Sequence, residues 1–160
     1  MKNTMNENEL FFRTIQSGNV ENIGFQLDKN PNLANIKDGR GFTPLIFATY
    51  FGQPDIAKLL IERGADVNVQ DASGNTALIG VSFKGNKDLV DLLLDSNADV
   101  DIQNKNGTTA LIFATQYNQK TIVETLLNRQ ANTSIKDNEG KIAIDYAKEK
   151  GFETIEALLK

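Results

Sequence analysis

The sequence of 160 residues contains no histidine, no cysteine and no tryptophan. Without imidazole or thiol groups, the chain has no histidine base, no cysteine nucleophile, no disulfide and no soft-ligand zinc site. No apolar run approaches the roughly 20 residues that a helix needs to cross a bilayer. The N-terminal residues also lack the apolar run of a secretory signal. These absences exclude the commonest active sites and predict a cytoplasmic protein.

The charge balance narrows the choice of partner. The chain carries 17 Lys and Arg against 21 Asp and Glu, so its net charge is −4. Nucleic-acid binders gain affinity by neutralising phosphates with clustered cations, which this composition does not favour. Hydrophobic residues at 40% and charged residues at 24% are typical of a soluble folded chain. We therefore expect no nucleic acid, membrane, metal, cofactor or small-molecule substrate to bind.

A step of 33 residues runs through the chain. Glycines stand at Gly41, Gly74, Gly107 and Gly140. Leucines keep the same step through residues 27, 60, 93, 126 and 159, and alanines keep it through residues 65, 98 and 131. Such self-similarity at a fixed period is typical of a repeat protein, in which one small structural unit is repeated.

Each unit has the signals of two helices. Thr43 is a good helix N-cap and Pro44 suits the first helical position. The first helix is predicted to stop at Gly52, and a second apolar helix-length run follows and ends at Gly64. In a later unit Asn118 stands where Gly52 stands, and asparagine is the residue other than glycine that best tolerates a positive φ. The pattern predicts helix, tight turn, helix and loop.

The repeated motif resembles a known family. Residues 43–48, 76–81 and 109–114 read TPLIFA, TALIGV and TALIFA, and the loops at 64–68 and 97–101 read GADVN and NADVD. Over residues 9–160 the chain is similar to the ankyrin repeat, a 33-residue unit of two helices. The resemblance implies an all-α solenoid of helix–turn–helix units joined by β-turn or hairpin loops. The family's motif histidine is replaced here by Ile46, Ile79, Ile112 and Asp145, so apolar contacts must hold that layer.

We expect residues 1–8 to be a flexible N-terminus and residues 9–160 to form one domain. Its units are predicted at about 9–37, 38–70, 71–103, 104–136 and 137–160. The first and last have polar outer faces, as caps require, so we expect a complete five-unit protein. We also expect it to be a monomer. The first unit is one residue longer than the others, and we place the extra residue between Asn30 and Asn35.

Several motifs resemble catalytic or metal sites without meeting their requirements. Ser82 lies between Gly80 and Gly85, but this spacing is one residue too long for a nucleophile elbow, and the chain has no histidine. Polar residues before Gly107 lack the spacing of a calcium loop. Carboxylates at 38, 71 and 137 share one repeat position, so a turn role is favoured over a catalytic site. A carboxylate-only hydrolase stays open as an unlikely alternative.

The resemblance implies where a partner would bind, because the variable positions of the family flank the turn glycine and precede the glycine between the helices. Five of the twelve aromatic residues fall at these positions, which is enough for an interface patch. An alternative has Phe51 and Phe83 folded back onto their helix pair. The remaining aromatics named for the core are Phe11, Phe12, Phe25, Phe47, Phe113 and Tyr146. The candidate partner-binding residues are Arg40, Phe42, Tyr50, Phe51, Asn75, Phe83, Lys84, Gln116, Tyr117, Lys141 and Lys150.

The sequence thus predicts a protein–protein interaction module that binds a partner protein on its concave face and is not an enzyme. A first alternative is a dedicated subunit that regulates or neutralises one specific enzyme. The dedicated subunit would have one tight, stoichiometric partner, whereas a general interaction module would not be restricted to one.

Overall fold

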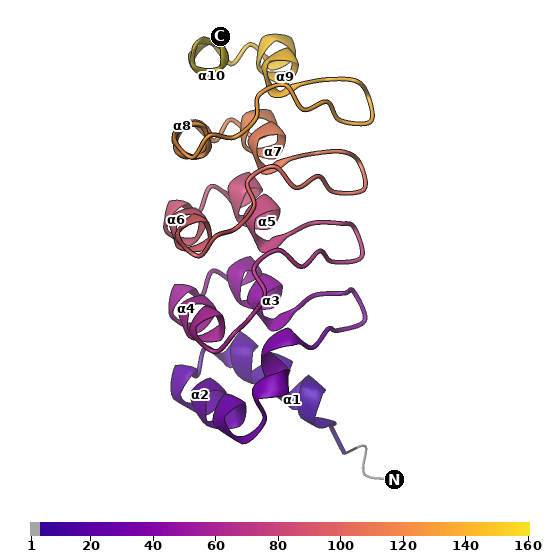
Figure 1. Ribbon diagram of the computed structural model, residues 1–160, viewed down its shortest axis with the longest axis vertical. Coiled ribbons are helices and arrows are strands. Elements are labelled where there is room, and N and C mark those ends of the chain that lie inside the picture. Colours follow the sequence, from indigo (N-terminus) through magenta and orange to yellow (C-terminus); the bar gives the residue numbers. More distant parts are fainter. Residues whose placement is uncertain (1–3) are drawn as a thin grey trace.

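The computed structural model describes residues 4–160, which form ten α-helices and one 3-10 helix, with no β-strand in that range. Figure 1 shows the helices in two parallel rows, with the odd-numbered helices in one row and the even-numbered helices in the other. The elements are α1 (Glu7–Ser17), α2 (Val20–Lys29), η1 (Pro31–Asn35), α3 (Pro44–Tyr50), α4 (Pro54–Glu62), α5 (Ala77–Lys84), α6 (Lys87–Asp95), α7 (Ala110–Gln116), α8 (Lys120–Asn128), α9 (Ala143–Lys150) and α10 (Glu153–Leu159). The predicted all-α repeat solenoid is confirmed.

The helix boundaries of the middle units follow from their caps. The Thr43 hydroxyl accepts a hydrogen bond from the Ile46 N–H at 3.2 Å, and Thr76 and Thr109 do the same for the residue three positions on. Beyond the C-terminal end of α7, Asn118 adopts a φ of 55°, close to the 64° of Gly52. The predicted caps and the predicted asparagine turn are therefore confirmed.

The first unit departs from the predicted boundaries. Its helix α1 begins at Glu7, two residues before the predicted start at residue 9, because Asn6 and Glu9 form a capping box. The Asn6 side chain accepts from the Glu9 N–H at 2.9 Å, and the Glu9 carboxylate accepts from the Asn6 N–H at 3.3 Å. Residues 1–3 of the predicted flexible N-terminus lie outside the described residues.

The prediction that the extra residue lies between Asn30 and Asn35 is wrong. Gly18 stands 34 residues before Gly52, but the buried Leu27 already stands 33 before the buried Leu60, so the extra residue lies between Gly18 and Leu27. The 3-10 helix η1 follows it.

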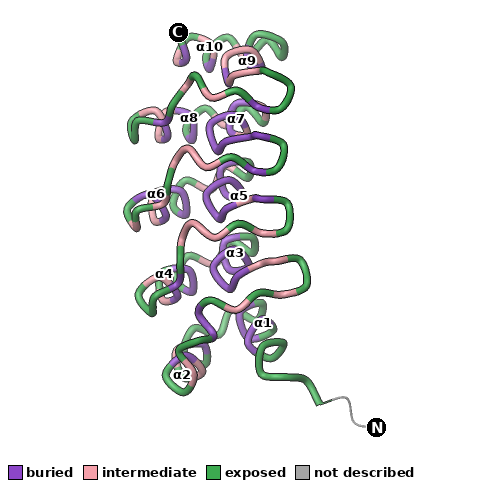
Figure 2. Tube along the Cα trace, turned by 45° about the vertical axis from the view of Figure 1, so that its right-hand side comes forward, coloured by how far each residue is buried: buried purple, intermediate pink, exposed green. Residues whose placement is uncertain are grey.

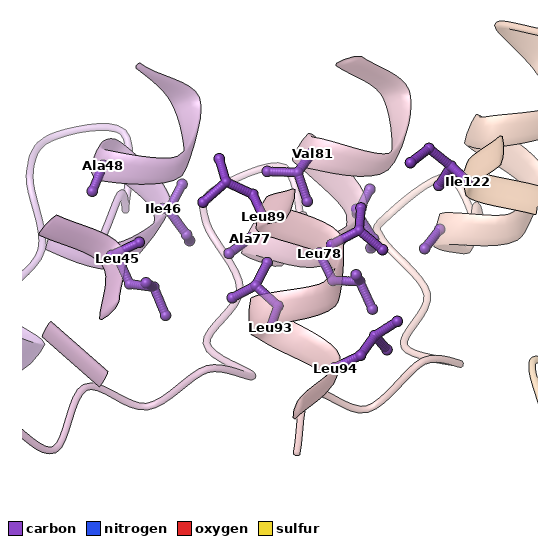
Figure 3. Close-up of a cluster of buried hydrophobic side chains, with 14 of the residues drawn as sticks. Leu45, Ile46, Ala48, Ala77, Leu78, Val81, Leu89, Leu93, Leu94 and Ile122 are labelled. Carbon is purple, nitrogen blue, oxygen red and sulfur yellow. The ribbon is translucent and has the colours of Figure 1, made fainter. Parts of the chain in front are cut away.

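The core is a continuous apolar ridge between the two rows. The repeated leucines at 27, 60, 93 and 126 are all fully buried, and Figure 2 shows the burial running along the first helices of the middle units. Figure 3 shows Leu78, Leu89 and Leu93 in one buried cluster around α5 and α6. Ile46, Ile79 and Ile112 are buried too, so apolar side chains fill the layer in which the family's motif histidine would stand.

One predicted core aromatic is wrong. Phe25 on α2 is 57% exposed, with the Lys29 ammonium 4.4 Å from its ring centroid. The repeat step places Phe25 in register with Lys58, Asp91 and Glu124, which is an outward position on the second helix. The other predicted core rings are buried or, for Phe113, partly buried against the core.

The predicted turn role of the repeated carboxylates is confirmed. The side chain of Asp71 accepts hydrogen bonds from the backbone N–H groups of Ser73 at 2.8 Å and Asn75 at 2.9 Å. Residues 38, 104 and 137 hold their own turns in the same way. Neighbouring turns are also linked, since the Ala72 N–H donates to the Arg40 carbonyl at 3.0 Å and the two later pairs repeat this bond. The turns therefore form a hydrogen-bonded stack alongside the helices.

This stacking gives a prediction for two glycines of nearly equal conformation. Gly74 and Gly140 have φ of 80° and 77°, but a Cβ on Gly74 would lie 2.7 Å from the Lys105 backbone nitrogen, and one on Gly140 would meet nothing within 4 Å. Gly140→Ala should cost only the strain of left-handed backbone, about 1–2 kcal/mol. Gly74→Ala should cost more because the next turn must move away. Urea unfolding of both variants tests this, and equal losses would contradict the steric argument.

The last turn links stability to pH. The Asp137 carboxylate accepts hydrogen bonds from the Tyr146 hydroxyl and from the N–H groups of Lys141 at 3.0 Å and Glu139 at 2.9 Å. Burial opposes ionisation of this carboxyl group. The hydrogen bonds outweigh that effect, so the pKa of Asp137 lies below its ordinary value of 3.8.

We expect Asp137→Asn to destabilise the protein near neutral pH but to have progressively less effect in acid. A carboxyl group with a lowered pKa contributes stability that is present above 3.8 and is lost as the pH falls through the folded-state pKa. Asparagine should preserve the turn itself, because Asn104 accepts the same pair of N–H bonds in its own unit. Urea unfolding from neutral to acid pH measures the difference in free energy of unfolding between the unaltered chain and the variant. This difference should become smaller toward low pH. A difference that does not change with pH would refute the proposed role of the Asp137 charge.

Candidate functional site

The turns and the first helices enclose an apolar hollow at the centre of the stack. Its volume is about 220 Å³, and α3, α5 and α7 all contribute to its wall. Six of the predicted partner-binding residues line it: Phe42, Tyr50, Asn75, Phe83, Lys84 and Tyr117. We call this feature the aromatic hollow. These six residues were predicted from three separate units, and the fold brings them together around one hollow.

The rings around the hollow pack against one another and remain open to solvent. The Phe83 and Tyr117 rings meet edge to face with centroids 4.7 Å apart, and the Tyr50 ring lies 6.1 Å from that of Phe42. Tyr50 is 51% exposed, Tyr117 53% and Phe83 37%. Mutual packing fixes the orientation of these rings while leaving apolar surface for another molecule to cover.

The alternative in which Phe51 and Phe83 fold back onto their helices holds only in part. Phe51 packs against the buried Phe47 with centroids 4.8 Å apart, and Phe83 lies 6.3 Å from Phe113. Both rings nevertheless stay exposed, at 41% for Phe51. Phe51 lies outside the wall of the aromatic hollow, next to Tyr50 at 5.3 Å. Each phenylalanine thus uses part of its surface for packing and leaves part of it uncovered.

Two lysines border the rings. The Lys84 ammonium lies 3.7 Å from the Tyr50 ring centroid and donates to the Tyr50 carbonyl at 2.5 Å. The Lys150 ammonium donates to the Gln116 carbonyl at 2.9 Å and lies 6.0 Å from the Tyr117 ring centroid. Within residues 4–160, neither lysine forms an ion pair. Two cations without a salt-bridge partner therefore lie beside the rings, although the chain as a whole is acidic.

The other predicted residues do not line the aromatic hollow itself. Arg40 stacks on Phe42 at 4.2 Å and pairs with Asp38 at 2.9 Å. Lys141 pairs with Glu149 at 3.0 Å; the hydrogen bond from its ammonium to this carboxylate raises the lysine's pKa. The wall also contains residues that the sequence argument missed, among them Ile46, Thr49, Gly80 and Phe113.

The catalytic alternatives find little support in the geometry. Ser82 is fully buried, so its hydroxyl has no access to a substrate. Glu9 and Asp38 line a second hollow together with Arg13, but both carboxylates are already engaged. Glu9 caps α1, and Asp38 bonds to Arg40 and to its own turn. Burial would raise the pKa of Asp38, but its hydrogen bonds and the Arg40 charge lower it overall, which disfavours a general acid.

None of the helices within residues 4–160 is both long enough and apolar enough to span a bilayer. The aromatic hollow is the candidate site. It combines exposed rings, a shaped apolar cavity and bordering cations, which suit the binding of another molecule rather than the transfer of protons or groups.

Comparison with known proteins agrees with the repeat architecture. The chain is 45% identical over 49 residues to the human DNA-binding protein RFXANK, an alignment that covers 31% of this chain and 19% of that protein. It is 41% identical over 56 residues to the rat ankyrin repeat and SAM domain-containing protein 6, covering 35% of this chain and 6% of that protein. The chain thus matches only a small part of either relative. A family model described as ankyrin repeats (3 copies) matches residues 10–104 and again residues 78–160, so the chain belongs to the ankyrin-repeat family.

Proposed function

We propose that this protein is an interaction module that binds a partner protein over the aromatic hollow, on the face formed by the turns and the first helices. Ankyrin repeats are generally protein–protein interaction modules, which supports the class of function. The observation that carries the proposal is the group of half-exposed rings, Tyr50, Phe83 and Tyr117, around one apolar cavity. Large rings at the centre of a face are typical of interface hot spots.

The proposal favours a protein over a nucleic acid as partner. One relative is named as a DNA-binding protein, but it is matched over only 19% of its length. This chain has a net charge of −4, which repels a phosphate backbone. The candidate surface is built from rings around an apolar cavity, and its cations are few. A partner that buries apolar side chains fits these features better.

The absence of a suitable acid–base pair at the hollow supports a role without catalysis. Among the described residues that line it, Asp71 is the one carboxylate, and its Oδ1 atom already accepts two turn hydrogen bonds. A hydrolase of the carboxylate type needs two such groups facing each other across a substrate. The proposed module binds its partner and leaves it chemically unchanged.

Native co-purification with mass spectrometry tests the proposal. Three baits are compared: the unaltered chain, Tyr50→Ala with Phe83→Ala, and Phe25→Ala. Phe25 is a matched control because it is also an exposed ring but lies on α2, in the other row of helices. A protein retained by the first and third baits and lost from the second supports the proposal. Retention by all three baits would contradict it, and a fixed one-to-one ratio would indicate a dedicated subunit.

A further inference from the structure

The repeat step identifies one position at which a ring is missing. Residues 47, 80, 113 and 146 occupy the same place in the first helices of four successive units, and they are Phe47, Gly80, Phe113 and Tyr146. Three units thus place an aromatic ring where the central unit has a hydrogen atom. This difference lies in α5, at the middle of the stack.

Neither the backbone nor a close neighbour requires glycine at position 80. Gly80 lies in the interior of α5, its φ is not positive, and a Cβ built on it would meet nothing within 4 Å. Glycine inside a helix is destabilising relative to alanine, so this residue adds nothing to helix stability. What it provides is open space.

That space belongs to the aromatic hollow. Gly80 lines the hollow together with the rings of Phe42, Tyr50, Phe83, Phe113 and Tyr117. In the preceding unit, the equivalent ring of Phe47 is buried against Phe12 at 5.2 Å and Phe51 at 4.8 Å. The space beside Gly80 therefore corresponds to the position that the Phe47 ring fills in the preceding unit. Aromatic side chains already form its walls.

The charges at the border of the hollow indicate which charged residues should flank the partner's inserted side chain. Lys84 lines the hollow, is fixed over the Tyr50 ring, and forms no ion pair within residues 4–160. Asp71 is also in the wall, but two turn N–H groups bond to its Oδ1 atom. Carboxylates next to the inserted group would find Lys84 on one side and Lys150, near Tyr117, further along the stack.

We propose that the aromatic hollow binds one aromatic side chain of the partner, inserted beside Gly80, from an acidic segment whose carboxylates pair with Lys84. This inference rests on the proposed function and specifies the chemistry of the partner at the same site. The inserted ring meets the edges and faces of five wall rings, which favours an aromatic over an aliphatic group. The flanking carboxylates of the partner replace hydrogen bonds to water with a charged hydrogen bond to the Lys84 ammonium, which is already held in place.

A displayed library of randomised peptides, panned against the unaltered chain, tests the inference while the natural partner is still unidentified. Enriched peptides should carry a Phe, Tyr or Trp flanked by Asp or Glu. Gly80→Phe, which restores the ring present in the neighbouring units, should bind them at least about tenfold more weakly. Gly80→Ala fills much less of the space, so it should lose less affinity than Gly80→Phe and melt no lower than the unaltered chain. Lys84→Gln should weaken binding less strongly and reduce its dependence on salt.

Direct observation of the site makes the test independent of the variants' folding. In a nitrogen-15-labelled unaltered chain, an enriched peptide should shift the Gly80 amide resonance, and the same peptide with its aromatic residue changed to Ala should not. Failure to enrich any peptide, enrichment without aromatic residues, or equal binding to a folded Gly80→Phe would overturn the inference. If the co-purified partner binds Gly80→Phe but not Tyr50→Ala with Phe83→Ala, the proposed function stands and only the inserted ring is refuted.

Discussion

Leu93→Ala should lower the free energy of unfolding by about 2–5 kcal/mol, the range for a large apolar side chain removed from a packed core. Leu93 is fully buried on α6 in the central unit, among the cluster of side chains seen in Figure 3. In a repeat protein each unit is stabilised mainly by its immediate neighbours. A cavity in the central unit therefore weakens the stack where both halves depend on it.

Urea unfolding followed by circular dichroism measures this effect. Leu10→Ala is the matched control, because Leu10 is the same residue type on a helix but is 50% exposed. Its loss should stay within about 0.5 kcal/mol, as for most surface substitutions. If the two variants lose the same stability, Leu93 does not have the core role that its burial indicates.

Tyr50→Ala combined with Phe83→Ala should weaken partner binding by at least about 100-fold with little change in the melting temperature. Hot-spot side chains cost about 2 kcal/mol or more on truncation, and every 1.4 kcal/mol is tenfold in affinity. The melting temperature should hold because both rings are substantially exposed and lie outside the buried ridge. Isothermal titration with the co-purified partner measures the affinity, and calorimetric unfolding measures stability.

Phe25→Ala again serves as the control for this pair, since it removes an exposed ring from α2 and should leave the affinity unchanged. Two outcomes would contradict the assignment. Unfolding of the double variant would place Tyr50 and Phe83 in the structural core, and an unchanged affinity would show that the partner binds elsewhere.

Much of the fold could be predicted from the repeat period, because residues that begin and end helices recur in each unit. Thr43 as N-cap, the left-handed Asn118 and the turn role of Asp71 were all predicted correctly from residue type and spacing. The terminal unit was less predictable. The capping box at Asn6 makes α1 begin earlier than predicted. It consists of local hydrogen bonds that are not part of the 33-residue repeat, so the repeat could not indicate it.

The candidate site shows where reasoning from single residues stops. The repeat register indicated outward-facing rings such as Tyr50, but not that residues of α3, α5 and α7 would enclose a cavity. Gly80 was missed because a glycine draws attention in turns, and here its importance is the side chain that it lacks. Phe25 was assigned to the core, although its register with Lys58 and Asp91 places it outside.

The most direct test of the central claim is to map the bound partner on the nitrogen-15-labelled chain by NMR. Binding over the aromatic hollow predicts shifts concentrated at Tyr50, Gly80, Phe83, Lys84 and Tyr117, with the outer helices α4, α6 and α8 unaffected. Shifts centred on those outer helices, with the amides around the hollow unchanged, would contradict the account.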